Sequence, residues 1–287
     1  MNREHFSGLI QKARRIVIKI GSARIAASLE ETNDFLFSLC SDVRQLRDQG
    51  KQITLVSSGA IAQGKRVLEK YENPDLMSLK EPGLKEKQAL AAIGQSRLMK
   101  LYESFFSKVN INIAQILFGE PQVLEPHSLE NLHNTFEQLL SWNILPIVNE
   151  NDSIATDEIK VGDNDLLSAM VSLVISADLL IILTGVDGFL KEGELISFLE
   201  GVEEKELSFA HGPEGPGTGG MHTKLKAGGI LAKYGIPTAI INGKEKNAVY
   251  RLMTENRLGT LIVPKTEKAN PQGEDTIQFL RREFKKK

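Results

Sequence analysis

The stretch Arg15-Ile16-Val17-Ile18-Lys19-Ile20-Gly21-Ser22 decides the fold of this chain. Its run of β-branched residues, stopped by a glycine, predicts a buried strand that ends in a turn. A lysine inside such a strand is costly to desolvate unless it meets an anion or a carboxylate. The alternative is a lysine that snorkels into solvent from the strand end. The stretch therefore predicts a central strand and makes Lys19 a candidate for binding an anion.

Short apolar strands alternate with helices along the rest of the chain. We expect further strands at 53–56, 111–118, 144–148, 179–183, 237–241 and 260–263, and helices at 33–49, 60–70, 84–108, 128–142, 165–177, 221–234 and 247–256. This alternation predicts right-handed βαβ units, and the continuously apolar strands predict burial on both faces. The expected fold class is α/β, a three-layer αβα sandwich around a mostly parallel open sheet. Without a repeat or a linker-like break, residues 1–287 are expected to form one domain, with a core at 13–264 and a tail at 265–287.

The composition excludes several classes of protein. The chain has 287 residues, of which 41% are hydrophobic and 25% charged, as in soluble globular proteins. Its 35 basic and 37 acidic residues argue against nucleic acid as the main partner. The single cysteine, Cys40, excludes a disulfide framework and a Cys-rich zinc site, and it is expected in the core. We find no signal peptide, and the most apolar stretch, 166–183, is broken by serines and Asp178, so we expect a cytoplasmic protein without a membrane partner.

Polar residues follow two of the predicted strands. Ligands of open parallel sheets bind beyond the carboxyl ends of the strands. The turn at 57–60, Ser-Ser-Gly-Ala, offers backbone N–H groups and a hydroxyl to an anion, although tight packing also favours small residues. The segments 149–152 and 160–165 gather amides, carboxylates and a lysine, which suit the ammonium and carboxylate of an amino acid. The alternative is a solvated loop with an Asx helix cap.

A glycine-rich loop precedes the predicted helix at 221–234. Residues 215–220 match the pattern G-x-G-x-x-G, but no strand precedes them and Ile240-Ile241 occupies the place of the acidic ribose ligand, so a dinucleotide fold is excluded. No Gly-Lys-Ser/Thr is present to form a Walker A motif. The loop still combines exposed amides, a helix N-terminus, Thr223 and Lys224, which together predict a phosphate site.

Six segments resemble, in order, the amino acid kinases and, within them, the glutamate 5-kinase family. These segments are 17–22, 56–62, 89–96, 146–152, 161–169 and 217–224, and the resemblance covers residues 13–264. The resemblance implies transfer of the γ-phosphoryl group of ATP to the side-chain carboxylate of L-glutamate. The product would be L-glutamyl 5-phosphate, the first intermediate of proline biosynthesis. Such a transfer needs positioning and charge neutralisation, and a carboxylate nucleophile needs no base.

The resemblance also implies roles for individual residues. Lys19 and Lys224 would contact the phosphate oxygens, with Asp165 holding both lysines. Ser58, Asp152 and Asn164 would bind glutamate. The ATP-binding residues would be Lys19, Thr184, Gly185, Thr218, Gly219, Gly220, Met221, His222, Thr223 and Lys224. Magnesium is expected to arrive with ATP, held by phosphates and water rather than by a protein metal site.

The chain departs from the family pattern in three places. Gly185 stands where an acidic or amide residue is common, so its nucleotide contact would be through the backbone. The segment 119–135 lacks the usual Asp-Arg and Asn-Ala-Arg pattern apart from His133-Asn134-Thr135. No PUA-like domain is expected after residue 264. A homo-oligomer, dimer or tetramer, is implied, with glutamate 5-phosphate reductase as a pathway partner.

Two other functions stay open at this point. The chain could be a related kinase that acts on N-acetylglutamate, aspartate or carbamate, or a non-catalytic sensor on the same fold. The presence of both Lys19 and Lys224 argues against a sensor, because binding alone tolerates the loss of one lysine.

Overall fold

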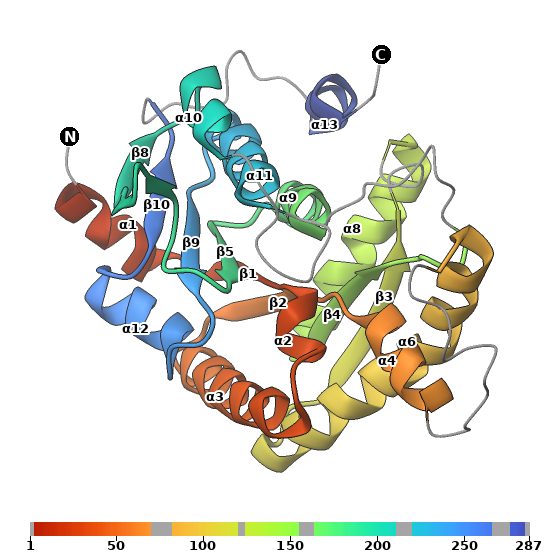
Figure 1. Cartoon of the computed structure of the whole chain (residues 1–287). Helices are drawn as coiled ribbons and strands as arrows, with labels where there is room; N and C mark the ends of the chain where they lie inside the picture. The colour runs from red at the N-terminus through yellow and green to blue at the C-terminus, as the bar shows by residue number, and fades with distance from the viewer. Residues whose placement is uncertain are drawn as a thin grey trace.

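A single mixed sheet organises the computed structural model, which describes residues 3–69, 82–119, 124–154, 164–210, 220–265 and 276–284 (Figure 1). Its strands lie in the order β3-β4-β2-β1-β5-β9-β10-β8. Their bounds are β1 (Arg15–Ile20), β2 (Gln52–Val56), β3 (Ile113–Phe118), β4 (Leu145–Glu150), β5 (Leu179–Thr184), β8 (Phe198–Glu200), β9 (Thr238–Asn242) and β10 (Thr260–Val263). All neighbours in this sheet pair in parallel except β9 and β10. The predicted α/β class with a mostly parallel sheet is confirmed.

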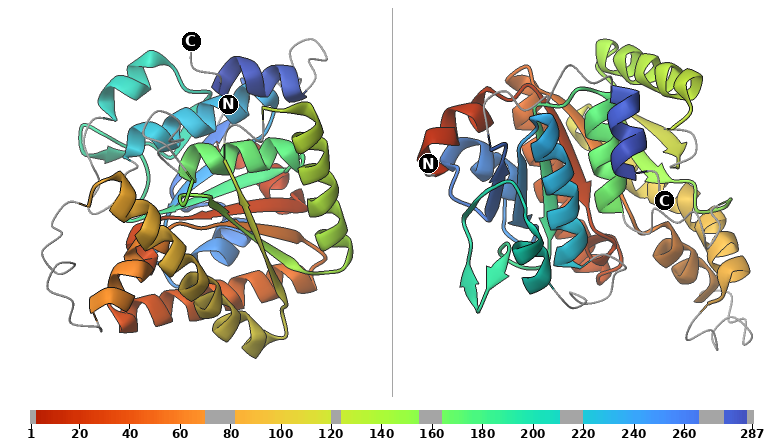
Figure 2. Two further views of the ribbon diagram at one scale, coloured as in Figure 1. Left: turned by 90° about the vertical axis from the view of Figure 1, so that its right-hand side faces the viewer. Right: turned by 90° about the horizontal axis from the view of Figure 1, so that it is seen from above.

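Helices cover both faces of the sheet (Figure 2). Helices α3 (Leu29–Asp48), α6 (Leu84–Phe106) and α12 (Ala248–Glu255) contribute to the hydrophobic core on one face. Helices α8 (Pro126–Ser141), α9 (Asn164–Val174), α11 (Met221–Tyr234) and α13 (Thr276–Phe284) contribute to the core on the other. The remaining elements are α1 (Ser7–Lys12), α2 (Ser22–Ile25), α4 (Ala60–Glu69), α10 (Glu204–Phe209), the short 3-10 helices η1 (Arg3–Phe6) and η2 (Ser107–Val109), and the small hairpin of β6 (Leu190–Lys191) and β7 (Glu194–Leu195). The expected three layers are therefore present.

The alternation of side chains along β1 places Lys19 on a defined face. Ile16, Ile18 and Ile20 belong to the core under α3, whereas Val17 belongs to the core under α9 and α11. Because successive side chains of a strand point to opposite faces, Lys19 shares the face of Val17. This is the face that carries α9 and α11.

The order of the strands makes β1 the point at which the chain changes direction across the sheet. The neighbours of β1 are β2 on one side and β5 on the other, and both pair with it in parallel. The chain therefore leaves β1 first toward one edge of the sheet and later returns to the opposite side. At such a switch point the loops after the strands separate, and ligands bind between them.

The helices α4 and α6 pack backbone against backbone. A Cβ added to Gly64 would lie 2.1 Å from the carbonyl oxygen of Leu90, so only glycine fits there. Helix α4 begins directly after the loop 57–59, and Ser57 Oγ lies 2.8 Å from the hydroxyl of Tyr102 on α6. Helix α6 thus fixes the position of this loop.

Helix α3 begins earlier than the sequence pattern predicts. Ser28 and Glu31 form a capping box, in which each side chain bonds the backbone N–H of the other, and this starts the helix at Leu29 rather than at residue 33. Gly50 follows the helix with φ +78°, the conformation expected after a C-cap. Cys40 on this helix is 2% exposed, as predicted for a core thiol, and burial raises its pKa to about 12.

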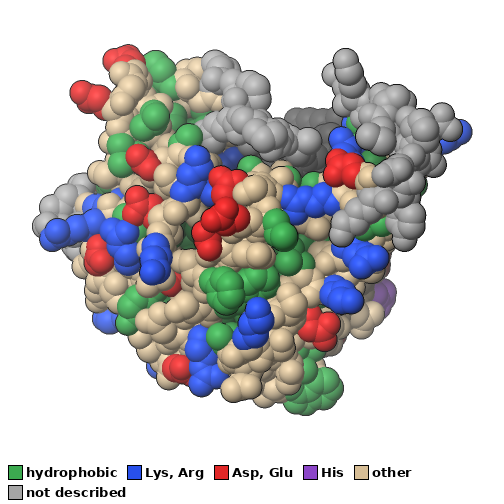
Figure 3. Space-filling view, turned by 60° about the horizontal axis from the view of Figure 1, so that its bottom comes forward, with side chains coloured by type: hydrophobic (Ala, Val, Ile, Leu, Met, Phe, Trp, Pro, Cys, Tyr) green, Lys and Arg blue, Asp and Glu red, His purple; other side chains and the backbone are tan. Residues whose placement is uncertain are grey.

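The surface over α3 carries an aromatic cluster. Figure 3 shows the face that includes α3, with Lys and Arg side chains around a central group of hydrophobic ones. Phe37 on α3 is 56% exposed, and its ring centroid lies 4.9 Å from that of Phe105. Lys108 Nζ lies 5.1 Å and 4.7 Å from the two centroids, a cation–π arrangement.

Within the described ranges, no helix is both long and apolar enough to span a membrane.

Candidate active site

Asp165 binds one lysine with each of its two carboxylate oxygens. Lys19 Nζ lies 2.5 Å from Oδ1, and Lys224 Nζ lies 3.3 Å from Oδ2. The aspartate is completely buried, and the lysines are 4% and 5% exposed. The three residues come from β1, the first turn of α9 and the first turn of α11. The structure thus brings together the two lysines and the aspartate that the sequence analysis singled out.

This arrangement favours an anion beside the lysines. Two ammonium groups share a single carboxylate, so the three groups together carry one positive charge. Two ammonium groups so close together attract an anion, and a phosphate oxygen brings the negative charge that stabilises them. Phosphate therefore suits this position better than a neutral ligand does.

The start of α11 adds further polar groups to the lysine pair. Thr223 Oγ1 donates to Asp165 Oδ2 at 3.0 Å and lies 2.9 Å from the carbonyl oxygen of Gly220. Lys224 Nζ also donates to that carbonyl at 3.2 Å. Gly220 is the N-cap of this 14-residue helix and has no side chain that could cap it. The N–H groups in the first turn of a helix favour a bound anion.

Asn164, next to Asp165, connects α9 to the loop after β2. Its Nδ2 lies 2.5 Å from the carbonyl oxygen of Ser57, 2.7 Å from Ser58 Oγ and 3.0 Å from Asn149 Oδ1. Asn149 is 2% exposed, and its Nδ2 donates to Gln95 Oε1 on α6 at 2.8 Å. A chain of amides therefore runs from helix α6 to the residue beside the lysine pair.

A cavity of about 290 Å³ opens beside this chain of amides. It lies between α6, the end of β3 and the segment that follows β4. Its lining residues are Ala91, Ala92, Gln95, Ser96, Gln115, Leu117, Glu150, Asn151, Asp152 and Ser153. The cavity combines two carboxylates with amides and hydroxyls, which is the chemistry that a zwitterionic ligand needs.

Of the residues predicted to bind the nucleotide, Thr184 and Gly185 lie at the end of β5, which pairs with β1 on the side opposite β2. Thr184 ends β5 and is 6% exposed, and Gly185 after it is exposed, with no atom within 4 Å of an added Cβ. Met221 is buried in the core under α11, and His222 is exposed, with Nδ1 3.4 Å from the carbonyl oxygen of Leu207. Thr218, Gly219 and residues 160–163 of the polar cluster lie outside the described residues.

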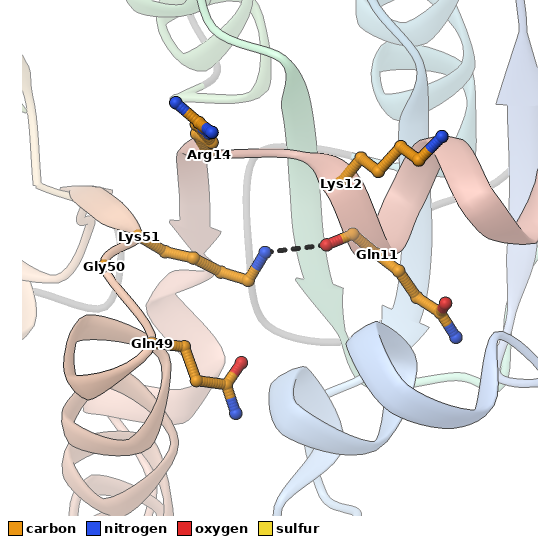
Figure 4. Close-up of a pocket in the computed structure, with 6 residues that line it drawn as sticks. All are labelled: Gln11, Lys12, Arg14, Gln49, Gly50 and Lys51. Atoms are coloured by element: carbon orange, nitrogen blue, oxygen red, sulfur yellow. Dashed lines mark hydrogen bonds between the residues drawn. The ribbon is translucent and has the colours of Figure 1, made fainter.

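A second, larger cavity lies at the opposite end of the strands. Its volume is about 600 Å³, and it is lined by Gln11, Lys12, Arg14, Gln49, Gly50 and Lys51. Lys51 Nζ donates to the carbonyl oxygens of Gln11 and Ala13 at 2.8 Å and 2.6 Å, which ties β2 to the segment before β1. Figure 4 shows this contact, with the side chains of Lys12 and Arg14 pointing away from it. The lysine has a structural role there, so the site at the carboxyl ends is the functional candidate.

The sequence of the chain matches the amino acid kinase family over residues 14–242. This range includes the lysine pair, the aspartate and the whole chain of amides. The chain belongs to the amino acid kinase family. Family membership confirms the resemblance and the predicted kinase class, and a kinase of this family uses ATP.

Individual curated proteins also match the chain over most of its length. The chain is 38% identical to a glutamate 5-kinase of Pelobacter propionicus over 89% of its own length and 69% of the relative's. It is also 38% identical to a glutamate 5-kinase of Enterococcus faecalis, over 88% of this chain and 96% of that protein. Among solved structures, a Giardia carbamate kinase superposes with a TM-score of 0.62 at 15% identity, covering 88% of this chain and 99% of the other. At that identity the structural match supports the amino acid kinase fold alone.

Two residues of the site were not singled out by sequence reasoning. Asn149 was noted only as part of a polar segment, and Gln95 only as part of a resembling helix. The sequence held no signal for Gln95, because its helix face carries a second amide, Gln88, beside small and apolar residues. The roles of the other site residues remain predictions, which we develop below.

Proposed function

We propose that this kinase transfers the γ-phosphoryl group of ATP to the side-chain carboxylate of L-glutamate, forming L-glutamyl 5-phosphate in proline biosynthesis. The observation that carries the proposal is the Lys19–Asp165–Lys224 cluster, which adjoins an amide chain from Asn164 through Asn149 to Gln95 in the wall of the acceptor cavity with Asp152. The homologous glutamate 5-kinases support the choice of glutamate.

Lys19 and Lys224 would contact the oxygens of the transferring phosphoryl group. Charge on these oxygens is spread during transfer, and pre-placed cations stabilise it without reorganisation. Asp165 would keep the two ammonium groups at a fixed separation before the nucleotide binds. The N–H groups at the start of α11 would donate hydrogen bonds to further phosphate oxygens.

The acceptor carboxylate is ionised near neutral pH and attacks without a base. Asn164 uses Nδ2 on Ser57, Ser58 and Asn149, which leaves its Oδ1 to accept from the ammonium of the substrate. The carboxylate of Asp152 would pair with the same ammonium, and Ser58 would hold the substrate from the loop after β2. These roles divide the site into a cationic half for phosphate and an acidic half for the amino group.

Magnesium would enter as part of the MgATP substrate. Within the described ranges, no group of three or more His, Cys, Asp or Glu side chains could hold a metal ion. Both oxygens of Asp165 face lysines, so the carboxylate nearest to the phosphate position is already neutralised. Magnesium that keeps its waters and binds phosphate oxygens fits such a site.

The nucleotide would lie along the ends of β5 and α11. Its proposed contacts are Lys19, Thr184, Gly185, Gly220, Met221, His222, Thr223 and Lys224, together with Thr218 and Gly219 outside the described residues. The backbone of Gly185 would face the nucleotide, since this residue has no side chain.

We also propose that residues 1–287 act as one domain, because one sheet contains both β1 and β10 and six of the strands between them in the chain. The resemblance to glutamate 5-kinases supports a homo-oligomer in the cytoplasm. It also supports a reductase as the next enzyme, because an acyl phosphate is reactive and is consumed by reduction. Sedimentation velocity on the purified chain measures the oligomer directly, and a monomer at micromolar concentration would contradict that part.

The function is tested by measuring magnesium-dependent ADP release with L-glutamate, N-acetylglutamate, aspartate and carbamate in parallel. Turnover confined to L-glutamate is expected. Turnover with another acceptor would keep the role of the lysines and overturn the assignment of Asp152 and Asn164. No turnover with any of the four would favour a nucleotide or amino acid sensor.

A further inference from the structure

Gln95 contributes to the acceptor cavity without having a role in the mechanism above. It lies on α6, it is partly buried, and it lines the cavity together with Glu150 and Asp152. Its Oε1 accepts the hydrogen bond from Asn149 Nδ2 at 2.8 Å. Gln95 is therefore the end of the amide chain that reaches the wall of the cavity.

Backbone groups fix the orientation of every amide in this chain. The N–H of Glu150 donates to Asn149 Oδ1 at 3.0 Å, so this atom must be the oxygen. The carbonyl of Ser57 accepts from Asn164 at 2.5 Å, so the contacting atom must be Nδ2. Asn149 must consequently present its NH₂ group to α6, and only the oxygen of Gln95 can receive it.

The same reasoning fixes what Gln95 offers to a ligand. With Oε1 bound to Asn149, the other atom of the amide group is the donor Nε2. An acceptor substrate with a carboxylate brings oxygens that this donor can bind. The orientation of Gln95 is thus set by two backbone groups that come from other elements, β4 and the loop after β2.

We propose that Gln95 is a positioning residue for the acceptor substrate, acting through Asn149 on Asn164 and Ser58. The proposal rests on the proposed function, in which Asn164 and Ser58 bind the acceptor. Without Gln95, the buried NH₂ group of Asn149 loses its partner, which is costly, and Asn149 is expected to rotate away from Asn164. The acceptor half of the site would be affected, whereas Lys19, Asp165 and Lys224 would keep their contacts.

The test compares Gln95→Met with the wild type in steady-state kinetics. Methionine matches the length of glutamine without its hydrogen bonds. We expect the KM for the acceptor to rise about tenfold, the effect of losing one hydrogen bond between uncharged groups. The KM for ATP should change less than about twofold. The matched control is Gln138→Met on α8, an exposed glutamine whose side chain donates a hydrogen bond to Ser141 of its own helix.

A double-mutant cycle with Asn164→Ala separates a positioning role from an independent one. If Gln95 acts through Asn149 on Asn164, the effect of Gln95→Met on kcat/KM for the acceptor is largely lost when Asn164 is already alanine. Effects that simply multiply would overturn the proposal, as would an equal rise of both KM values or no change in either.

These kinetics use whichever acceptor the wild type phosphorylates. The role of Gln95 can then be tested separately from the proposal that the acceptor is glutamate. If that acceptor is not glutamate, the proposed function fails while the test of Gln95 proceeds unchanged. If no acceptor is phosphorylated, both proposals are overturned. Thermal unfolding is recorded for Gln95→Met and for a second variant, Gln95→Ser. Loss of the fold in both would assign Gln95 to stability and overturn its positioning role.

Discussion

A Cβ added to Gly94 of α6 would lie 1.7 Å from the carbonyl oxygen of Ala60, the first residue of α4. The two helices therefore touch through their backbones at the point where the loop 57–59 enters α4. Ser58, a proposed acceptor ligand, lies two residues before this contact. The separation of α4 and α6 thus bears directly on the geometry of the acceptor half of the site.

Gly94→Ala is expected to destabilise the protein by about 1–3 kcal/mol, because a methyl group cannot fit against a carbonyl without moving a helix. It should also raise the KM for the acceptor, since α4 carries the loop with Ser58. Urea unfolding and steady-state kinetics measure the two effects. Gly8→Ala on α1 is the control, because no atom lies within 4 Å of its added Cβ. Equal stability of the two variants would contradict the packing argument.

Lys224→Met should lose most turnover while keeping nucleotide binding. Methionine fills the same space, but it brings no charge to the phosphoryl oxygens, and the loss of one such donor costs about 10²–10³-fold in kcat. The readouts are the rate of ADP release and calorimetric binding of a non-hydrolysable ATP analogue. Lys226→Met, an exposed lysine on the same helix, is the control. Unchanged kcat would remove Lys224 from the mechanism.

Asp152→Asn should impair the use of glutamate far more than that of ATP. The proposed partner of this carboxylate is the substrate ammonium, and a hydrogen bond to a charged group contributes about 1.5–3 kcal/mol, or about 10- to 100-fold in KM. N-acetylglutamate has no ammonium, so any weak turnover of it should not fall further. Asp34→Asn, on the exposed side of α3, serves as the control. Equal losses for glutamate and ATP would contradict the role of Asp152.

Asp42 is a buried carboxylate away from the site, and it binds the start of another helix. It lies on α3, is 1% exposed, and accepts the N–H of Val249 in α12 through Oδ2 at 3.1 Å. Burial raises its pKa to about 6, against the opposing effect of the N–H groups of Val249 and Tyr250. The folded protein therefore holds a proton on Asp42 more tightly than the unfolded chain does.

The contribution of Asp42 to stability is expected to decrease as the pH rises. Because the pKa of Asp42 is higher in the folded state, its contribution to the free energy of unfolding is complete below the pKa of the unfolded chain, near 4. This contribution, about 3 kcal/mol at most, is lost as the pH rises through about 6. Asp42→Asn should remove this part of the dependence, because its amide oxygen still accepts from Val249. Urea unfolding of both proteins between about pH 4 and pH 7.5 measures it. If the free energy of unfolding changed equally with pH in the wild type and in Asp42→Asn, Asp42 would not titrate in this range.

The sequence predicted the central elements of the fold well, because apolar runs and glycine stops mark buried strands. The strand predicted to start at Arg15 is β1, and the helix predicted from Met221 to Tyr234 is α11. Strand direction was harder to infer. β10 runs antiparallel to β9, which its apolar pattern cannot reveal, since a buried strand looks the same in either direction. The two-residue strands β6 and β7 are too short to leave a pattern.

The charged part of the site was predictable for a physical reason. A lysine in a buried strand is costly unless it meets an anion, and a glycine-rich loop before a helix favours phosphate, so Lys19 and Lys224 stood out from the residues alone. Their pairing with Asp165 was expected from the family resemblance. The amide chain gave no such signal, because Gln95 and Asn149 lie 54 residues apart and amides are common on surfaces. Only the packing of α6 against the end of β4 brings these two side chains together.

The burial of Asp165 and its two lysines also bears on a competing reaction, the hydrolysis of ATP. A phosphoryl group held by Lys19 and Lys224 has protein on the side of Asp165, which is closed to solvent. An acceptor bound in the cavity lined by Asp152 would in turn displace water from the side of the phosphoryl group that faces this cavity. In the proposed kinase, the enclosure that strengthens the ionic contacts would therefore also couple the consumption of ATP to the presence of its acceptor.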